Sequence, residues 1–345
     1  MHTDELDSAA ARQALVQAAS RLGFSACRIA PAIPTPFGDE YRGWLARGCH
    51  ASMEWMAAQL EKRLNPEKVL SGVRSIAVLA FDYAACDARV LPGRFARYAQ
   101  GMDYHALLWE KLADLDETLR FYGGTQRCHT DTGPVNERDY AVLSGLGWRG
   151  RNNQLIRPAR GSLFFLSTIM TTLALPTDAP ERPRCGACRR CEERCPGKAL
   201  KDGLCDARRC LSYWTIEHKG VIPEEWRVLM GDRLYGCDIC LEACPWNRLA
   251  REAADSRLLM PRDVASKPLR DFLALDDDSF SALFRCSPVR RLKRERFLRN
   301  VCCVLGNIGR AEDLPALRLS CEDAPLIAEH AVWALGRIAM RRDAP

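Results

Sequence analysis

Two runs of closely spaced cysteines constrain the fold of this chain more than any other feature. Each run ends in Cys-Pro, and the two runs consist of Cys185, Cys188, Cys191 and Cys195, followed by Cys237, Cys240 and Cys244. The first run has the spacing of bacterial two-cluster iron–sulfur proteins, in which the fourth cysteine binds the other cluster. Two cubane clusters need eight thiolates, so one more cysteine is required. Cys205 and Cys210 both lie between the runs, and spacing alone does not choose between them.

Zinc and disulfides are the competing explanations for these cysteines. Structural zinc sites use cysteine pairs, whereas a third cysteine at this spacing is typical of a cubane. A disulfide framework needs an oxidising compartment, and residues 1–20 are polar and charged, without the apolar segment of a signal peptide. The chain has 17 cysteines, an odd number, which favours reduced, metal-bound or buried thiols. We therefore expect a cytoplasmic protein with two [4Fe-4S] clusters.

Charge and apolar content limit the possible partners. The longest apolar stretch, residues 163–175, is interrupted by serine and threonine and is shorter than the roughly 20 residues of a membrane helix, so we expect no membrane span. The net charge is +6, and residues 285–299 alone contain seven basic side chains and one acidic one. Such a cluster suits a phosphate backbone, although on charge alone a solvated helix face is the favoured interpretation.

The first 175 residues mix helices and strands. Apolar spacing predicts helices over residues 4–22, 101–122 and 136–146, and helical pieces broken near Gly48 over residues 40–60. Short apolar runs predict strands over residues 24–30, 74–81, 127–131, 154–156 and 162–173. The pattern predicts an α+β protein whose N-terminal domain, residues 1–178, has an α/β fold.

Two further domains are expected after a proline-rich linker at residues 176–183. Residues 179–250 form a loop-rich, ferredoxin-like domain for two [4Fe-4S] clusters, and residues 251–345 form an all-α domain. Within the latter, residues 301–309 and 331–338 match each other with Leu305 and Leu335 thirty positions apart. This internal match predicts a HEAT-like helical repeat.

The N-terminal domain lacks the usual cofactor motifs. It has no G-x-G-x-x-G for a dinucleotide and no phosphate-binding P-loop, yet an electron-carrying domain beside it requires a second redox centre. The cobalamin motif D-x-H-x-x-G begins at Asp103 and His105, but Leu108 replaces its glycine. Read by themselves, Asp131 is more often a turn residue than a catalyst, and His105 more often a cap or surface residue than a ligand. Arg138, on the helix that follows, could pair with Asp131, but exposed helix arginines are common and such pairs usually contribute little.

Longer motifs make the chain similar to a known family. They are Arg97-Tyr-Ala-x-Gly-x-Asp-Tyr-His105, Asp131-Thr-Gly-Pro-Val-x-Glu-Arg138, Gly145-Leu-Gly-Trp-x-Gly150, Asp206-Ala-Arg-Arg-Cys-Leu-Ser-Tyr213 and Tyr235-Gly-Cys-Asp-Ile-Cys240 with Cys244-Pro-Trp-Asn247. This set resembles the epoxyqueuosine reductases from about Arg63 into the C-terminal repeat. The resemblance implies a cobalamin- and iron–sulfur-dependent oxidoreductase that reduces epoxyqueuosine at the wobble position of tRNA, the last step of queuosine biosynthesis.

The resemblance also implies the ligands and the general acid. One cluster would be held by Cys185, Cys188, Cys191 and Cys244, and the other by Cys195, Cys210, Cys237 and Cys240, which leaves Cys205 spare. Cobalamin would be held, without a protein ligand to cobalt, by Arg63, Asp131, Arg138, Asn152, Ser212 and Asp238. The family's general acid matches Asp131. A carboxylic acid is protonated at neutral pH only if burial or a like charge raises its pKa, so we expect Asp131 to face a closed pocket.

The implied macromolecular partner is a tRNA anticodon stem-loop. Its single-stranded loop allows the target base to be splayed into a pocket while basic side chains hold phosphates. The candidates are Lys219, Arg233, Arg290 and Arg291. We also expect an external electron donor and a monomeric chain. The alternative is a reductive dehalogenase-like enzyme acting on a small molecule, against which the lack of a twin-arginine leader counts.

Overall fold

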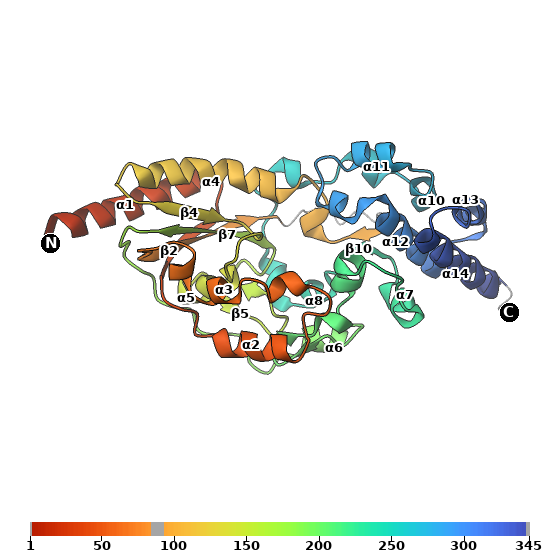
Figure 1. Ribbon diagram of the computed structural model, residues 1–345, viewed down its shortest axis with the longest axis horizontal. Helices are drawn as coiled ribbons and strands as arrows, with labels where there is room; N and C mark the ends of the chain where they lie inside the picture. Colours follow the sequence, from red (N-terminus) through yellow and green to blue (C-terminus); the bar gives the residue numbers. More distant parts are fainter. Residues whose placement is uncertain (1, 84–92, 343–345) are drawn as a thin grey trace.

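A four-stranded antiparallel sheet forms the centre of the N-terminal part. The computed structural model describes residues 2–83 and 93–342 (Figure 1). The sheet order is β1 (Ala26–Pro31), β2 (Ser75–Asp82), β7 (Phe164–Thr171) and β4 (Gln126–His129). Every residue of β2 is buried, as its apolar run predicts. The mixed α/β character expected from the sequence is confirmed.

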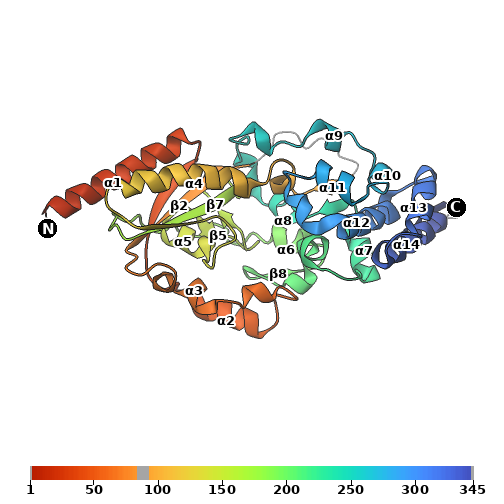
Figure 2. The same cartoon turned by 45° about the horizontal axis from the view of Figure 1, so that its top comes forward.

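Helices cover both faces of this sheet. Alternate residues of β2, including Leu79, pack in one core with α1 (His2–Arg21) and α4 (Tyr104–Arg120). The residues between them, including Val78, pack in a second core with α5 (Glu137–Leu143). Figure 2 shows α1 and α4 on one side of the sheet, and α5, α2 (Gly38–Ala46) and α3 (Leu60–Leu64) on the other. The period of two along β2 therefore sets which helix covers which face.

The cysteine-rich part is built from short elements. They are α6 (Arg190–Arg194), the hairpin β8 (Leu200–Lys201) and β9 (Leu204–Cys205), α7 (Glu224–Met230), β10 (Arg233–Tyr235) and α8 (Ile239–Glu242), with a π-helical turn at Tyr213–Glu217. A second hairpin, β5 (Trp148–Arg149) with β6 (Leu155–Ile156), lies before them in the chain. Strand β10 pairs in parallel with β3 (Arg94–Phe95), so the cysteine-rich part is joined to the N-terminal part by backbone hydrogen bonds.

Helices form the C-terminal part: α9 (Arg262–Ala265), α10 (Leu269–Phe272), α11 (Asp277–Leu283), α12 (Lys293–Ile308), α13 (Leu314–Ser320) and α14 (Pro325–Arg342). The two matching segments lie on α12 and α14, which pack against each other. A Cβ atom on Gly306 would lie 2.2 Å from the ring of Trp333, so this close approach requires glycine. The helical repeat itself stays a prediction.

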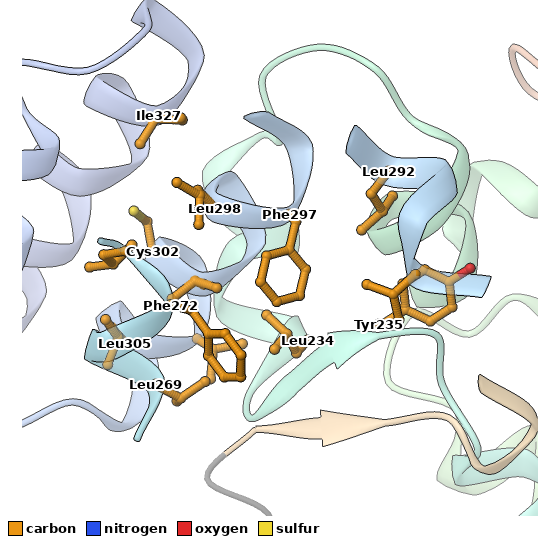
Figure 3. Packing of buried hydrophobic residues seen from close by; sticks show 14 of the residues in the cluster. Leu234, Tyr235, Leu269, Phe272, Leu292, Phe297, Leu298, Cys302, Leu305 and Ile327 are labelled. Carbon is orange, nitrogen blue, oxygen red and sulfur yellow. The ribbon is translucent and has the colours of Figure 1, made fainter. Parts of the chain in front are cut away.

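One apolar core crosses the expected domain boundaries. Leu234 and Tyr235 of β10 pack with Phe297 of α12 and Phe272 of α10 (Figure 3), and Phe95 of β3 belongs to the same core. Side chains from all three expected domains therefore share one interior. The division at residues 178 and 250 stays a prediction. No helix within residues 2–83 and 93–342 has the length and apolar content needed to cross a membrane.

Candidate active site and cysteine groups

Asp131 lies where the end of β4 meets the start of α4. The turn after β4 gives Asp131 a φ of 61°, a left-handed conformation that aspartate tolerates better than most residues. Helix α4 begins at Tyr104 because Asp103 caps it, accepting the His105 N–H at 3.0 Å. These two ends bring the cap residue Asp103 and the first two residues of α4, Tyr104 and His105, beside a carboxylate that is distant in the sequence.

A chain of polar contacts runs through this corner. The Tyr104 hydroxyl donates to Asp131 Oδ2 at 2.6 Å, and His105 Nε2 lies 3.4 Å from the same oxygen. On the other side of the imidazole, Nδ1 lies 2.7 Å from Asp103 Oδ1. The Tyr104 ring is stacked on Phe165 and on His105, with ring centroids 4.1 Å apart in both pairs. The four residues Asp103, Tyr104, His105 and Asp131 are called the catalytic corner below.

The charge state of this corner differs from the one expected. Burial raises the pKa of Asp131, but hydrogen bonds from His105 and Tyr104 outweigh it, and the net pKa is lowered. The side chain is also 59% exposed. The expectation of a closed pocket with a raised pKa is therefore wrong for this structure. Burial lowers the pKa of His105, whereas its bonds to Asp103 and Asp131 raise it to about 9. At neutral pH the proton accordingly resides on His105.

Glu137 is a second carboxyl group at this corner, and no local sequence pattern assigned it a role. Its Oε2 accepts the backbone N–H of Asp131 at 3.0 Å, while its Oε1 is buried without a hydrogen-bond partner. Burial and the charge of Asp131 raise the pKa of Glu137 to about 8. Arg138, which the sequence allowed as a partner of Asp131, donates to the carbonyl of Asn153.

The cysteines fall into two electrostatic groups that follow the predicted sets. Cys244 interacts with Cys185 and Cys188, and Cys191 interacts with Cys244. These four thiols line a cavity of about 30 Å³ together with Ile156 and Trp246. In the second group, Cys240 interacts with Cys237, Cys210 and Cys195. In the described part of the chain, no three His, Cys, Asp or Glu side chains meet around a point that could hold a single metal ion.

The spare thiol, Cys205, hydrogen-bonds to Cys210. This bond and burial raise the pKa of Cys205, and the same bond lowers the pKa of Cys210. Cys205 lies on β9, and Cys210 follows the 3₁₀ turn Ala207–Arg209. The hairpin and this turn place Cys205 beside Cys210 of the second group. Cys240 interacts with both Cys205 and Cys210, so both thiols lie near the second group.

The six positions expected around cobalamin are spread over several elements. Asn152 is buried, lines the cavity of the first cysteine group and has an amide nitrogen without a hydrogen-bond partner. Ser212 is next to the second group, since its backbone N–H donates toward Cys210. Asp238 accepts the Arg97 N–H at 2.7 Å, and burial raises its pKa to about 6.

The two arginines of that set lie near Tyr41 of α2. The charges of Arg63 and Arg138 both act on Tyr41 of this helix, where they oppose the effect of burial on its pKa. Arg63 donates to the carbonyl of Trp55 at 3.2 Å and lies over its ring. Among the six positions, Asp131 alone belongs to the catalytic corner, and the others lie toward α2 and the cysteine groups.

The basic residues expected to hold tRNA differ in their exposure and in their contacts within the protein. Lys219 and Arg290 are exposed, and Arg233 donates to the carbonyl of Met230 at 3.1 Å. Arg291 pairs with Glu217 at 2.9 Å, and its charge also acts on Asp131 and Asp103. Arg291 therefore connects the basic surface to the catalytic corner.

Much of the basic run 285–299 is structural. Arg299 is fully buried and donates to the carbonyls of His218, Gly220 and Trp214. Arg294 pairs with Asp323, and Arg296 donates to the carbonyls of Leu292 and Ile216. The favoured interpretation of this run as a solvated helix face is wrong for these three arginines, because their guanidinium groups donate hydrogen bonds to other parts of the protein.

Two protein-family models match parts of the chain. One described as "4Fe-4S double cluster binding domain" matches residues 184–247, and one described as "Epoxyqueuosine reductase QueG, DUF1730" matches residues 63–132. An epoxyqueuosine reductase of Xanthomonas campestris is 38% identical over 349 residues, covering 97% of this chain and 97% of its own. The chain belongs to the epoxyqueuosine reductase family.

Other epoxyqueuosine reductases agree with this assignment. The Escherichia coli protein is 33% identical over 99% of this chain and 93% of its own. A crystal structure of an epoxyqueuosine reductase with an epoxyqueuosine-modified tRNA-Tyr stem loop is similar with a TM-score of 0.88 and 28% identity, covering 95% of this chain and 90% of that one. A Bacillus subtilis epoxyqueuosine reductase, whose catalytic aspartate loop is swung out of the active site, gives a TM-score of 0.86 and 27% identity over the same shares.

Proposed function

We propose that this chain is an oxidoreductase that reduces epoxyqueuosine to queuosine in the anticodon of tRNA. The observation that carries the proposal is the similarity to epoxyqueuosine reductases over almost the whole of both chains. The similar structure that contains an epoxyqueuosine-modified tRNA stem loop supports tRNA as the substrate. A reductive dehalogenase-like activity is not favoured, because the relatives at 33–38% identity are epoxyqueuosine reductases.

Two [4Fe-4S] clusters are part of this proposal. The match of residues 184–247 to a double-cluster domain supports their presence. One cluster is assigned to Cys185, Cys188, Cys191 and Cys244, and the other to Cys195, Cys210, Cys237 and Cys240. The electrostatic interactions of Cys240 with Cys237, Cys210 and Cys195, and of Cys244 with Cys185 and Cys188, support this partition. The exchange of Cys195 and Cys244 between the sets follows the usual pattern of two-cluster domains.

Cobalamin is the second proposed cofactor. Its amide side chains need both donors and acceptors, which Arg63, Arg138, Asn152, Ser212 and Asp238 would provide. The buried amide nitrogen of Asn152, which has no hydrogen-bond partner among the described residues, is suited to such a ligand. When bound, cobalamin would supply low-valent cobalt for reductive cleavage of the epoxide, with electrons delivered singly through the clusters.

The protein's own task is to bind the anticodon and supply protons. Lys219, Arg233, Arg290 and Arg291 are proposed to hold phosphates, with Arg290 the most available because it is exposed and Arg291 already paired. Asp131 is proposed to face the epoxide oxygen. The hydroxyl of Tyr104 and the ring of His105 fix the position of its carboxylate before the substrate arrives.

The proposed function is tested with protein reconstituted anaerobically with iron, sulfide and cobalamin. We expect two [4Fe-4S] clusters by EPR and iron analysis, a corrinoid optical spectrum, and conversion of epoxyqueuosine to queuosine in a tRNA stem-loop by mass spectrometry. A protein that binds both cofactors and leaves the modified base unchanged would contradict the proposed reaction.

The cluster assignment can be tested with a matched pair of variants, at Cys210 and at Cys205. Cys210→Ser is expected to lose one of the two clusters, whereas Cys205→Ser is expected to keep both. Both substitutions remove a thiol from one hydrogen-bonded pair, so their effects on packing are similar. Loss of a cluster in Cys205→Ser alone would assign the eighth ligand to Cys205.

A further inference from the structure

The proposed reaction has a proton requirement that Asp131 alone does not meet. Conversion of an epoxide to an alkene breaks two carbon–oxygen bonds, forms one carbon–carbon π bond and releases the oxygen as water. The balance needs two electrons, which an external one-electron donor supplies through the clusters, and two protons. A carboxylate whose pKa is lowered by its neighbours holds no proton at neutral pH. The protons must therefore be stored elsewhere and reach the oxygen through this corner.

His105 has the geometry of a proton store. Its Nε2 faces Asp131 at 3.4 Å and its Nδ1 faces Asp103 at 2.7 Å, so each ring nitrogen points at a carboxylate oxygen. The ring is fixed by stacking on Tyr104. The Nε2 atom itself is buried without a hydrogen-bond partner among the described residues, so a proton returns to it through Asp131, whose side chain is 59% exposed. An imidazole that is held between two carboxylates and fixed by stacking can be discharged toward Asp131 and recharged through the same exposed carboxylate between transfers.

We propose that Asp103, His105 and Asp131 form a proton relay that supplies both protons of the epoxide reduction. In each transfer, the Nε2 proton of His105 moves to the Asp131 carboxylate and from there to the departing oxygen. The first transfer neutralises the oxygen when the first carbon–oxygen bond breaks, and the second completes water when the second bond breaks. Asp103 is a positioning residue, which orients the ring and favours its charged form. This inference rests on the proposed function.

The charged groups around His105 determine the pH range of the relay. Asp103 and Asp131 favour the imidazolium and raise its pKa to about 9. Glu137, packed behind Asp131, and Arg291, on the basic surface, also act on this cluster, the former by interaction with His105 and the latter with both carboxylates. Removal of the Asp103 charge should therefore lower the pH at which His105 loses its proton.

Asp103→Asn is the sharpest test, because asparagine caps a helix as well as aspartate does and the start of α4 is kept. We expect the single-turnover rate of the wild-type holoenzyme to stay level up to pH 8 and to fall around pH 9. In Asp103→Asn the fall should occur at least one pH unit lower. The NMR titration of His105 should move in the same direction in the absence of tRNA. An unchanged alkaline limb or an unchanged titration of His105 would overturn the relay.

His105→Asn tests the store itself. We expect its single-turnover rate to fall by about 10²–10⁴-fold, the usual contribution of a positioned acid–base group, with partial recovery on addition of imidazole. Glu110→Gln is the matched control, since it removes a charge from the same helix and its side chain pairs with Arg257 rather than with the catalytic corner. A rate within twofold of wild type in His105→Asn would overturn the inference.

The two proposals fail in different ways. If the wild-type holoenzyme converts epoxyqueuosine while His105→Asn and Asp103→Asn behave like wild type, the relay is wrong and the proposed function stands. If the wild-type holoenzyme leaves epoxyqueuosine unchanged, the reaction is wrong and the relay falls with it. Recovery by imidazole separates loss of a proton store from loss of packing, because a misfolded corner would not respond to it.

Discussion

The catalytic corner and helix α12 hold charged side chains in opposite ways. Arg299 of α12 has no exposed surface, and its donors are taken up by three backbone carbonyls and by Asn300. Asp131 is 59% exposed, and Glu137 behind it keeps a buried oxygen without a partner. A charged side chain whose donors and acceptors are all hydrogen-bonded within the protein stabilises the fold. A charged side chain with a donor or acceptor that is not hydrogen-bonded within the protein is available to a substrate or a proton.

The largest expected effect comes from the catalytic corner. Asp131→Asn removes the group that faces the proposed epoxide but keeps a hydrogen-bond acceptor for Tyr104 and a residue that tolerates a positive φ. We expect turnover to fall by about 10²–10⁴-fold with an unchanged melting temperature and unchanged cofactor spectra. The measurement is single-turnover conversion of epoxyqueuosine in a tRNA stem-loop. Undiminished turnover would remove Asp131 from the chemistry.

A substitution in helix α12 should lower stability, which the Asp131 variant is expected to keep. Arg299→Met leaves three buried carbonyls without their donor, and we expect a loss of about 3 kcal/mol in the free energy of unfolding. Lys293→Met, at an exposed position of the same helix, is the control and should change stability by less than about 0.5 kcal/mol. Urea denaturation measures both. Equal stability of the two variants would show that Arg299 is not structural.

The raised pKa of Glu137 predicts a smaller, pH-dependent effect. A carboxyl group with a folded pKa of about 8, against an ordinary value of 4.5, favours the folded state at low pH and loses that contribution as the pH rises through 8. Glu137→Gln keeps an acceptor for the Asp131 N–H and cannot ionise. We expect it to melt at higher temperature than wild type above pH 8, with the difference shrinking toward pH 5. A difference that does not depend on pH would contradict the raised pKa.

The smallest effect is expected on the basic surface. Arg290→Ala should weaken binding of a tRNA stem-loop and reduce the slope of log K against log salt by about 1, since one phosphate contact is lost. Arg21→Ala is the control, because Arg21 ends α1, far from α12 in Figure 1. Fluorescence anisotropy between 50 and 200 mM salt, concentrations at which such slopes are about linear, measures both. An unchanged slope in Arg290→Ala would exclude this arginine from phosphate binding.

The sequence predicted those features that depend on local pattern. The apolar run of residues 74–81 and the helical apolar spacing of residues 101–122 are patterns of neighbouring residues, and the corresponding strand β2 and helix α4 are found. Contacts between distant segments were not predictable in this way. No local pattern places His105 at Asp131, or directs Arg299 to carbonyls some 80 residues earlier in the chain, because these depend on how α4 and α12 pack.

Asp131 shows how this limit affects a functional prediction. The type and position of the residue were predicted, but its ionisation depends on Tyr104 and His105, which the fold brings to it. Sequence reasoning treated His105 as a cap or surface residue because a lone histidine at a helix start usually is one. The incomplete motif from Asp103 to His105 is the available signal, but as part of a cobalamin motif it indicates a cobalt ligand and not a contact with Asp131.

The pairing of β3 with β10 restricts how this protein can be divided into pieces. β3 lies nine residues before the start of α4, and its only strand partner among the described residues is β10, from the cysteine-rich part. A truncated chain that ends at the linker would leave Phe95 uncovered and the segment leading to His105 untethered. Truncation should therefore disturb proton handling even though Asp103, His105 and Asp131 all remain in the shorter fragment.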